Sequence, residues 1–135
     1  MDRLDHFEGA DVFFRSPDPE YRWLVPGLLE RGDRLLITGN EGKGKSTLLR
    51  QFAAQISLGI HPVTLLPFDP PKVALLDLEN SAVQIRRQVH RLMPRWESFK
   101  GDSFRVSVRL NGMDLLRDVE QRDLIRILDA FKPDL

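Results

Sequence analysis

The fold of this chain is decided by the stretch Gly39-Asn40-Glu41-Gly42-Lys43-Gly44-Lys45-Ser46, which is followed by Thr47. The stretch fits the pattern G-x-x-x-x-G-K-[ST] at every fixed position. A loop that wraps phosphate groups points backbone N–H groups inward, and glycines supply the dihedral angles that a Cβ atom would obstruct. In such a loop Lys45 reaches the β- and γ-phosphates of a nucleotide and the Ser46 hydroxyl holds Mg²⁺. We therefore predict that residues 39–47 bind a nucleotide.

The residues on both sides of this loop agree with that prediction. Residues 34–38 form a short apolar run of strand length. An apolar stripe at helical spacing follows the loop, at Leu48, Leu49, Phe52, Ala53 and Ile56. The order of strand, glycine loop and helix aims the positive end of the helix dipole at the phosphates. We expect a strand over about 34–38 and a helix over about 45–58.

The composition excludes several classes of site. The chain has no cysteine, which excludes disulfides and thiolate metal sites, and its three histidines are scattered without ligand spacing. The formal net charge is zero, so the chain as a whole gives no signal for nucleic acid or membrane. No apolar run approaches the length of a membrane span, and Asp2 and Asp5 make the N-terminus unlike a signal peptide. We expect a cytoplasmic protein without a membrane segment.

Strand and helix patterns alternate along the rest of the chain. After an acidic arm we expect a proline-rich loop over 59–72, strands over 73–78 and 104–108, helices over 82–93 and 118–131, and a turn at Asn111-Gly112. Ser81 is the expected N-cap of the first of these helices, and Pro94 its stop. The basic face of this helix is typical of a solvated surface, with a nucleic-acid or subunit contact as the alternative. This alternation predicts an α/β fold, a parallel sheet with helices on its faces.

Two carboxylates stand where the chemistry beside the loop would need them. Ligands of a parallel sheet lie at the carboxyl ends of its strands, and Asp77 and Glu79 end the 73–78 strand. Being two residues apart, they are expected to project to the same side of an extended strand. Glu79 has the position of a base that orients the attacking water, or it marks the exit of the strand into solvent. Asp77 is either a Mg²⁺ ligand or a buried polar group bonded to neighbouring backbone.

These segments together resemble a known family. The chain resembles the RecA-like P-loop ATPases in three segments, namely 23–32, 34–47 and Val73-Ala74-Leu75-Leu76-Asp77-Leu78-Glu79-Asn80. Among these ATPases it looks closest to the bacterial, plasmid and phage group related to the RepA-type hexameric replicative helicases. The resemblance covers residues 21–135. It implies ATP and Mg²⁺ as cofactors, Lys45 and Glu79 as catalytic residues, and Glu79 as the catalytic base. It further implies a homo-oligomer, a hexamer in the full-length form, that couples ATP hydrolysis to DNA transactions such as replication.

The chain departs from this family near residue 135. Family members carry a Walker B strand that ends in a Mg²⁺-linked aspartate, whereas Lys132-Pro133-Asp134-Leu135 looks like only the entry to such a strand. No substitute comes from the aspartates that follow no hydrophobic strand, namely Asp114, Asp118 and Asp129. We therefore expect 1–22 to be an N-terminal arm and 23–135 the N-terminal part of a RecA-like ATPase domain, with a truncated sheet. Such a chain is expected to have open strand edges, to bind nucleotide weakly and to lack hydrolysis on its own.

Two other classes of protein stay open. A small-molecule kinase shares the phosphate loop, and the arginines over 86–95 resemble its lid, although they follow directly after the 73–78 strand. A non-catalytic nucleotide-sensing module is the second alternative. A GTPase is disfavoured, because no Asn-Lys-x-Asp segment is present to read the base.

Overall fold

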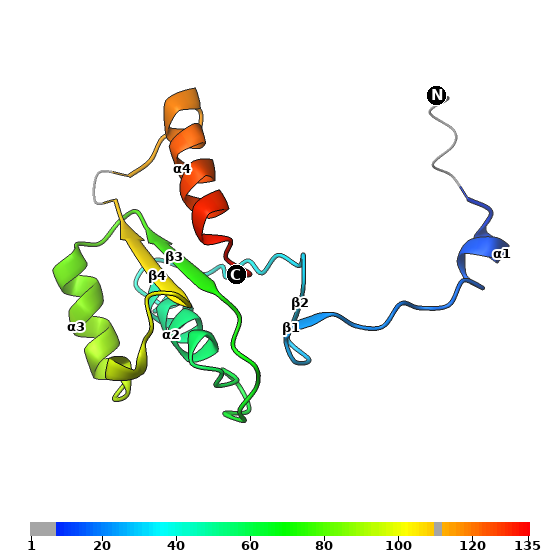
Figure 1. Cartoon of the computed structure of the whole chain (residues 1–135), viewed down its shortest axis with the longest axis horizontal. Coiled ribbons are helices and arrows are strands. Elements are labelled where there is room, and N and C mark those ends of the chain that lie inside the picture. Colours follow the sequence, from blue (N-terminus) through cyan, green and yellow to red (C-terminus); the bar gives the residue numbers. More distant parts are fainter. Residues whose placement is uncertain (1–7, 110–111) are drawn as a thin grey trace.

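The computed structural model describes residues 8–109 and 112–135 (Figure 1). Its elements in chain order are α1 (Ala10–Phe13), β1 (Trp23–Val25), β2 (Leu29–Glu30), α2 (Lys45–Ser57), β3 (Val73–Asp77), α3 (Ala82–Leu92), the 3₁₀ helix η1 (Trp96–Ser98), β4 (Phe104–Val108) and α4 (Asp118–Phe131). The helices expected from the sequence agree with α2, α3 and α4, and two of the expected strands agree with β3 and β4. The turn expected at Asn111-Gly112 lies partly outside the described residues.

A parallel pair of strands forms the centre of the fold. β3 pairs with β4 in register, from Val73 opposite Phe104 to Asp77 opposite Val108. The two strands are joined by α3 and η1, because parallel neighbours need a crossover that returns the chain to the same end of the sheet. The predicted α/β class, a parallel sheet with flanking helices, is confirmed.

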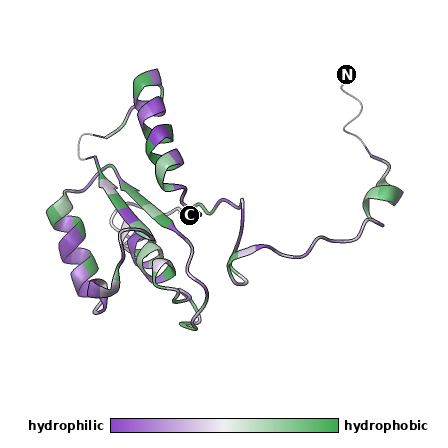
Figure 2. Ribbon diagram, viewed as in Figure 1, coloured by the Kyte–Doolittle hydropathy of each residue, from purple (hydrophilic) through white to green (hydrophobic). Residues whose placement is uncertain are grey.

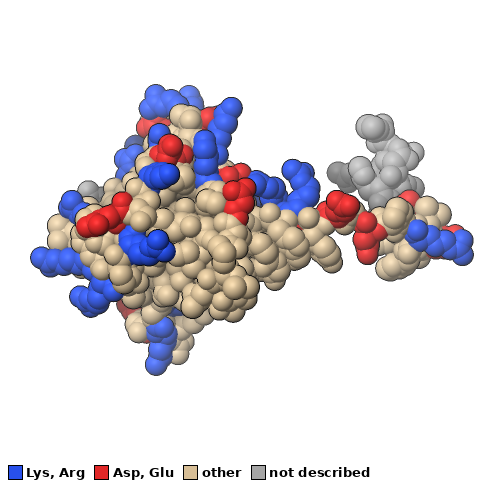
Figure 3. Space-filling view, turned by 60° about the horizontal axis from the view of Figure 1, so that its bottom comes forward, with Lys and Arg blue, Asp and Glu red and all other residues tan. Residues whose placement is uncertain are grey.

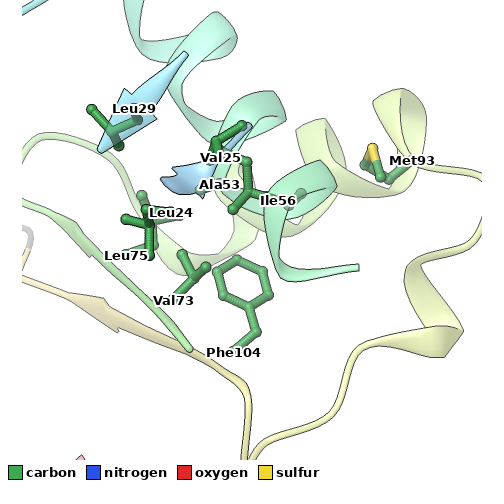
Figure 4. Close-up of a cluster of buried hydrophobic side chains, with 10 residues drawn as sticks. Leu24, Val25, Leu29, Ala53, Ile56, Val73, Leu75, Met93 and Phe104 are labelled. Atoms are coloured by element: carbon green, nitrogen blue, oxygen red, sulfur yellow. The ribbon is translucent and has the colours of Figure 1, made fainter. Parts of the chain in front are cut away.

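Different helices cover the two faces of this sheet (Figure 1). Val73 and Leu75 are buried on the face that packs against α2, where they meet Ala53 and Ile56 in the main hydrophobic cluster (Figure 4). Leu76 points to the opposite face and lines a cleft together with the apolar side of α4. The division follows from the two-residue period of a strand, which sends successive side chains to opposite faces.

Helix α3 is largely hydrophilic (Figure 2). Ile85 is its buried residue. The predicted N-cap is confirmed, because the Gln84 N–H donates to Ser81 Oγ at 3.2 Å and the Ser81 N–H donates to Gln84 Oε1 at 2.9 Å. This reciprocal pair satisfies two donors at the helix start, and the helix ends before Pro94, as expected.

Helix α4 is less well covered than its sequence pattern predicts. The helical spacing of the apolar residues predicts that five side chains face inward, namely Val119, Leu124, Ile127, Leu128 and Phe131. Phe131 is the buried residue of this helix, and Arg105 and Lys72 lie over its ring, 4.7 and 5.6 Å from the centroid. Val119 is 65% exposed, so its inward placement was wrong, whereas Ile127 and Leu128 line the cleft beside the sheet but remain 44% and 37% exposed. A sheet face of two strands is too narrow to cover all of an apolar stripe that runs along 14 residues.

A short hairpin precedes the phosphate loop and was not predicted. β1 and β2 pair antiparallel across a turn in which the Leu28 N–H donates to the Val25 carbonyl at 3.0 Å. Pro26 and Gly27 are the central residues, and Gly27 has a φ of +69°, which is the geometry of a type II turn. The hairpin delivers Leu24 and Val25 to the main cluster.

The strand predicted over 34–38 is wrong. These residues form no strand, and Leu35 and Leu36 are exposed. A strand needs a neighbour for its backbone N–H and C=O groups. The β3 edge away from β4 is engaged instead at its start, where the Ala74 N–H donates to the Leu135 carbonyl at 2.8 Å. A cleft of about 320 Å³, lined by Leu35, α2, β3 and Leu135, lies along this edge.

Candidate nucleotide-binding site

The predicted phosphate loop leads directly into α2. Gly42 and Gly44 have φ angles of +73° and +84°, in the left-handed region that residues with a Cβ rarely adopt. Gly44 is the N-cap of α2, so the helix begins at Lys45, as the sequence predicts. The loop therefore turns on glycine and delivers its last residues to a helix N-terminus.

This helix end presents backbone donors to the loop. No side chain caps it, and its first bond runs from the Leu48 N–H to the Gly44 carbonyl at 2.9 Å. The N–H groups of Lys45, Ser46 and Thr47 precede that bond and have no partner within the helix. Together with the positive end of the helix dipole, such donors form a site suited to phosphate groups.

Lys45 lies over the same loop. Its Nζ donates a hydrogen bond to the Asn40 carbonyl at 2.7 Å, and its stem passes over Gly39, where an added Cβ would stand 3.5 Å from Lys45 Cδ. The other predicted loop contacts are on the surface: Asn40, Glu41 and Lys43 are exposed, and Thr47 is half-buried. A cation and several backbone donors thus gather at one end of α2, which fits the phosphates of a nucleotide.

A cleft of about 220 Å³ lies between α2 and the end of β3. It is lined by Ser46, Leu49, Arg50 and residues 75–80. Ser46 comes from the first turn of α2, and Glu79, which is exposed, comes from the bend that follows β3. The side chain predicted for Mg²⁺ and the side chain predicted for water therefore share one cleft, whereas residues 39–45 do not line it.

Asp77 is buried beneath the bend that carries Glu79. Its Oδ1 accepts hydrogen bonds from the backbone N–H groups of Glu79 at 3.1 Å and Asn80 at 2.8 Å, and its Oδ2 accepts from Arg50 Nε at 3.0 Å. Burial raises the pKa of Asp77, but the hydrogen bonds, first the one from Arg50, outweigh it and hold the pKa below the usual range. Asp77 is thus a buried polar group bonded to neighbouring backbone, the second of its two interpretations.

The expectation that Asp77 and Glu79 project to the same side was wrong in one respect. The strand ends at Asp77, and Glu79 lies on the bend beyond it. Asp77 is therefore buried while Glu79 is exposed, although both residues line the cleft.

The comparison with protein families agrees with this geometry. A family model described as an AAA domain matches residues 2–133, which is nearly the whole chain. The chain belongs to this AAA domain family. Its members are P-loop ATPases that depend on nucleotide and, in general, on Mg²⁺. No curated protein and no solved structure was found that matches the chain.

Two polar residues at the site of this AAA domain were not predicted from its sequence, namely Arg50 and Gln88. Arg50 is 4% exposed and donates to Asp77, and it also donates from Nη1 to Gln88 Oε1 on α3. A signal for Arg50 was present, because it lies three and four residues before the buried Ala53 and Ala54 and thus on the inner face of α2. The partner on α3 carried no such signal.

The described residues form neither a metal-binding cluster nor a membrane span. Within the ranges 8–109 and 112–135, no group of three or more His, Asp or Glu side chains is arranged to hold a metal ion. No helix of these ranges is both long enough and apolar enough to cross a membrane.

Proposed function

We propose that this AAA domain binds Mg·ATP at residues 39–47 and belongs to an ATPase that uses Glu79 to orient the attacking water. One observation carries the proposal: the glycine loop ends at the N-terminus of α2, and Ser46 from that end shares a cleft with Glu79. Binding and hydrolysis groups are thereby assigned to adjacent elements, the first turn of α2 and the carboxyl end of β3. ATP in place of GTP rests on the family alone.

Each residue of the site has a role that its position supports. The N–H groups that precede the first helical bond would donate to phosphate oxygens of a bound nucleotide, and the Lys45 ammonium, which donates to the Asn40 carbonyl, would hold the β- and γ-phosphates. The Ser46 hydroxyl holds Mg²⁺, which when bound offsets the negative charge of the phosphates. Glu79 is exposed at the cleft and its carboxylate accepts a hydrogen bond from the attacking water, which aligns it and takes up its proton.

The coupling to DNA and the ring assembly are further parts of this proposal. They are supported by the resemblance to the hexameric replicative helicases and by the exposed arginines of α3, namely Arg86, Arg87 and Arg91. Lys and Arg side chains stand at several separate places on the face shown in Figure 3. A subunit or DNA contact through α3 would therefore use a local row of charges and not one broad basic surface.

A non-catalytic nucleotide sensor is the second candidate function, because the exposed Glu79 has no hydrogen-bond partner for its side chain among the described residues. Glu79→Gln, made in the full-length form, separates the two functions. In an ATPase this substitution keeps Mg·ATP binding and lowers turnover by about 100-fold or more, since the amide cannot accept the proton. The matched control is Glu97→Gln, an exposed glutamate on η1 that lies outside the cleft.

Turnover that Glu79→Gln leaves equal to the control would contradict the role of Glu79 as the base. A small-molecule kinase would be indicated if hydrolysis were slow but phosphoryl transfer to a small hydroxyl compound were fast. Binding of Mg·ATP without turnover or transfer by the unaltered full-length form would favour the sensor.

A further inference from the structure

One buried network connects three elements at the floor of the cleft. Arg50 of α2 donates to Asp77 Oδ2 from Nε at 3.0 Å and from Nη2 at 2.5 Å. Its remaining nitrogen, Nη1, donates to Gln88 of α3. The other carboxylate oxygen of Asp77 accepts from the backbone N–H groups of Glu79 and Asn80. Both charged side chains are more than nine-tenths buried.

The network lies directly under the groups proposed for catalysis. Arg50 follows Ser46 by four residues, so both side chains stand on the same face of α2, one turn apart. Asp77 holds the backbone of the bend at Glu79 through two hydrogen bonds. A continuous path of side chains and backbone thus runs from the first turn of α2 to the residue proposed as the base.

Burying this ion pair has a higher desolvation free energy than an apolar contact at the same place would have. A buried ion pair must repay the desolvation of both charges, and apolar residues of similar volume often serve equally well for stability. Arg50 occupies a face of α2 whose neighbours Ala53 and Ala54 are buried and apolar. The planar guanidinium of Arg50 donates from two nitrogens to one oxygen of Asp77 and from the third nitrogen to Gln88, which fixes its orientation as an apolar contact would not.

We propose that Arg50 and Asp77 are positioning residues that set Glu79 relative to Ser46, and hence relative to the bound metal and phosphates. The inference rests on the proposed function, because the network can position Glu79 for catalysis only if a Mg-nucleotide binds at the loop. Gln88 accepts a hydrogen bond from Arg50 and so connects α3, the helix that follows β3, to the same network.

The test measures the distance from the bound metal to Glu79 in the 135-residue chain. The ¹⁵N-labelled chain is titrated with Mn²⁺ and a non-hydrolysable ATP analogue, because Mn²⁺ broadens the NMR signals of nearby amides steeply with distance. In the unaltered chain we expect loss of the amide signals of residues 45–47 and of Glu79 and Asn80. In the double variant Arg50→Met with Asp77→Leu, which keeps an apolar contact of similar volume, the signals of residues 45–47 should still be lost, while those of Glu79 and Asn80 should return.

A matched control uses an ion pair away from the cleft. Arg126 and Asp123 of α4 are paired at 3.1 Å with both side chains exposed, and Arg126→Met with Asp123→Leu should leave all the broadening as in the unaltered chain. Arg50→Lys is the second variant for the case in which the double variant does not fold. It keeps a positive charge opposite Asp77 but loses the planar group that donates to Asp77 and Gln88 together, and partial return of the Glu79 signal is expected.

The outcomes separate this inference from the proposed function. Unbroadened signals at residues 45–47 of the unaltered chain would contradict nucleotide binding at the loop, and the inference with it. Broadening at residues 45–47 that does not extend to Glu79 would contradict the inference alone. Broadening at Glu79 that persists unchanged in the folded variants would also overturn it, because Glu79 would then hold its place without the network.

Discussion

At the scale of single residues, Gly44 has two structural roles that favour glycine or depend on its position. It carries a φ of +84° and it is the N-cap from which α2 begins. Gly44→Ala is expected to lower the free energy of unfolding by about 1 kcal/mol, because a left-handed conformation is strained for any residue with a Cβ. The same change should weaken Mg·ATP binding, since relief of the strain moves the N–H groups of the loop. Urea denaturation and calorimetric titration measure the two effects.

Gly101→Ala is the control for this prediction. Gly101 does not have a positive φ, and an added Cβ there would meet no atom within 4 Å. This substitution should change the free energy of unfolding by no more than about 0.5 kcal/mol. Equal effects at Gly44 and Gly101 would show that the loop geometry does not depend on glycine.

Asp77 makes a prediction about acid stability. Because its pKa in the folded chain is below the ordinary aspartate value of about 3.9, its contribution is fully present above that value and is lost as pH falls through the lower, folded pKa. Asp77→Asn should destabilise the chain by about 3 kcal/mol near neutral pH, because Arg50 is left buried without its partner. Below pH ~4 the unaltered chain should lose stability more steeply than the variant. Urea titrations at a series of pH values test this, and parallel curves would contradict it.

At the scale of elements, residues 34–38 and β3 should behave differently although both have apolar sequences. β3 is bonded to β4 along its length, whereas residues 34–38 have no strand partner within the described chain. We expect the amide protons of residues 35–38 to exchange with deuterium rapidly, and those of the inner residues of β3 to be protected. Hydrogen–deuterium exchange followed by NMR measures this. Equal protection of both segments would mean that residues 34–38 form a paired strand in solution.

The elements that sequence reasoning found are those whose signals are local. The bounds of α2, α3 and α4 follow from apolar periodicity and caps such as Ser81, and the phosphate loop follows from its glycine spacing. The prediction of a strand over 34–38 was wrong because a strand needs a neighbouring strand to pair with, and apolar periodicity does not show whether one is present. The β1–β2 hairpin was missed although Pro26-Gly27 is a turn signal, because its strands are only three and two residues long.

Part of the candidate site also has local sequence signals, and part of it depends on contacts between distant residues. Residues 39–47 and Glu79 were predicted from spacing and from their place at a strand end. The network of Arg50, Asp77 and Gln88 joins residues 27 and 38 positions apart, and only the folded chain brings them together. A buried cation on the inner face of a helix is the sequence signal that would have pointed to it.

At the scale of the whole molecule, we propose that this AAA domain is built around a phosphate loop that binds Mg·ATP. α2 and β3 pack in one hydrophobic cluster, and the loop and the bend at Glu79 lie at adjoining ends of these two elements. The arm that carries α1 extends away from this body (Figure 1), and its residues 8–22 are exposed. Nucleotide binding should therefore depend on the body and on Lys45.

Calorimetric titration of the chain with Mg·ATP tests this claim most directly. The unaltered chain and the control Lys100→Ala, which removes an exposed lysine outside the cleft, should release the same heat and give the same affinity. Lys45→Ala should abolish the binding heat while its circular dichroism spectrum stays that of the unaltered chain. Nucleotide binding at the phosphate loop would be contradicted if Lys45→Ala bound Mg·ATP with the affinity of the control, or if the unaltered chain did not bind it.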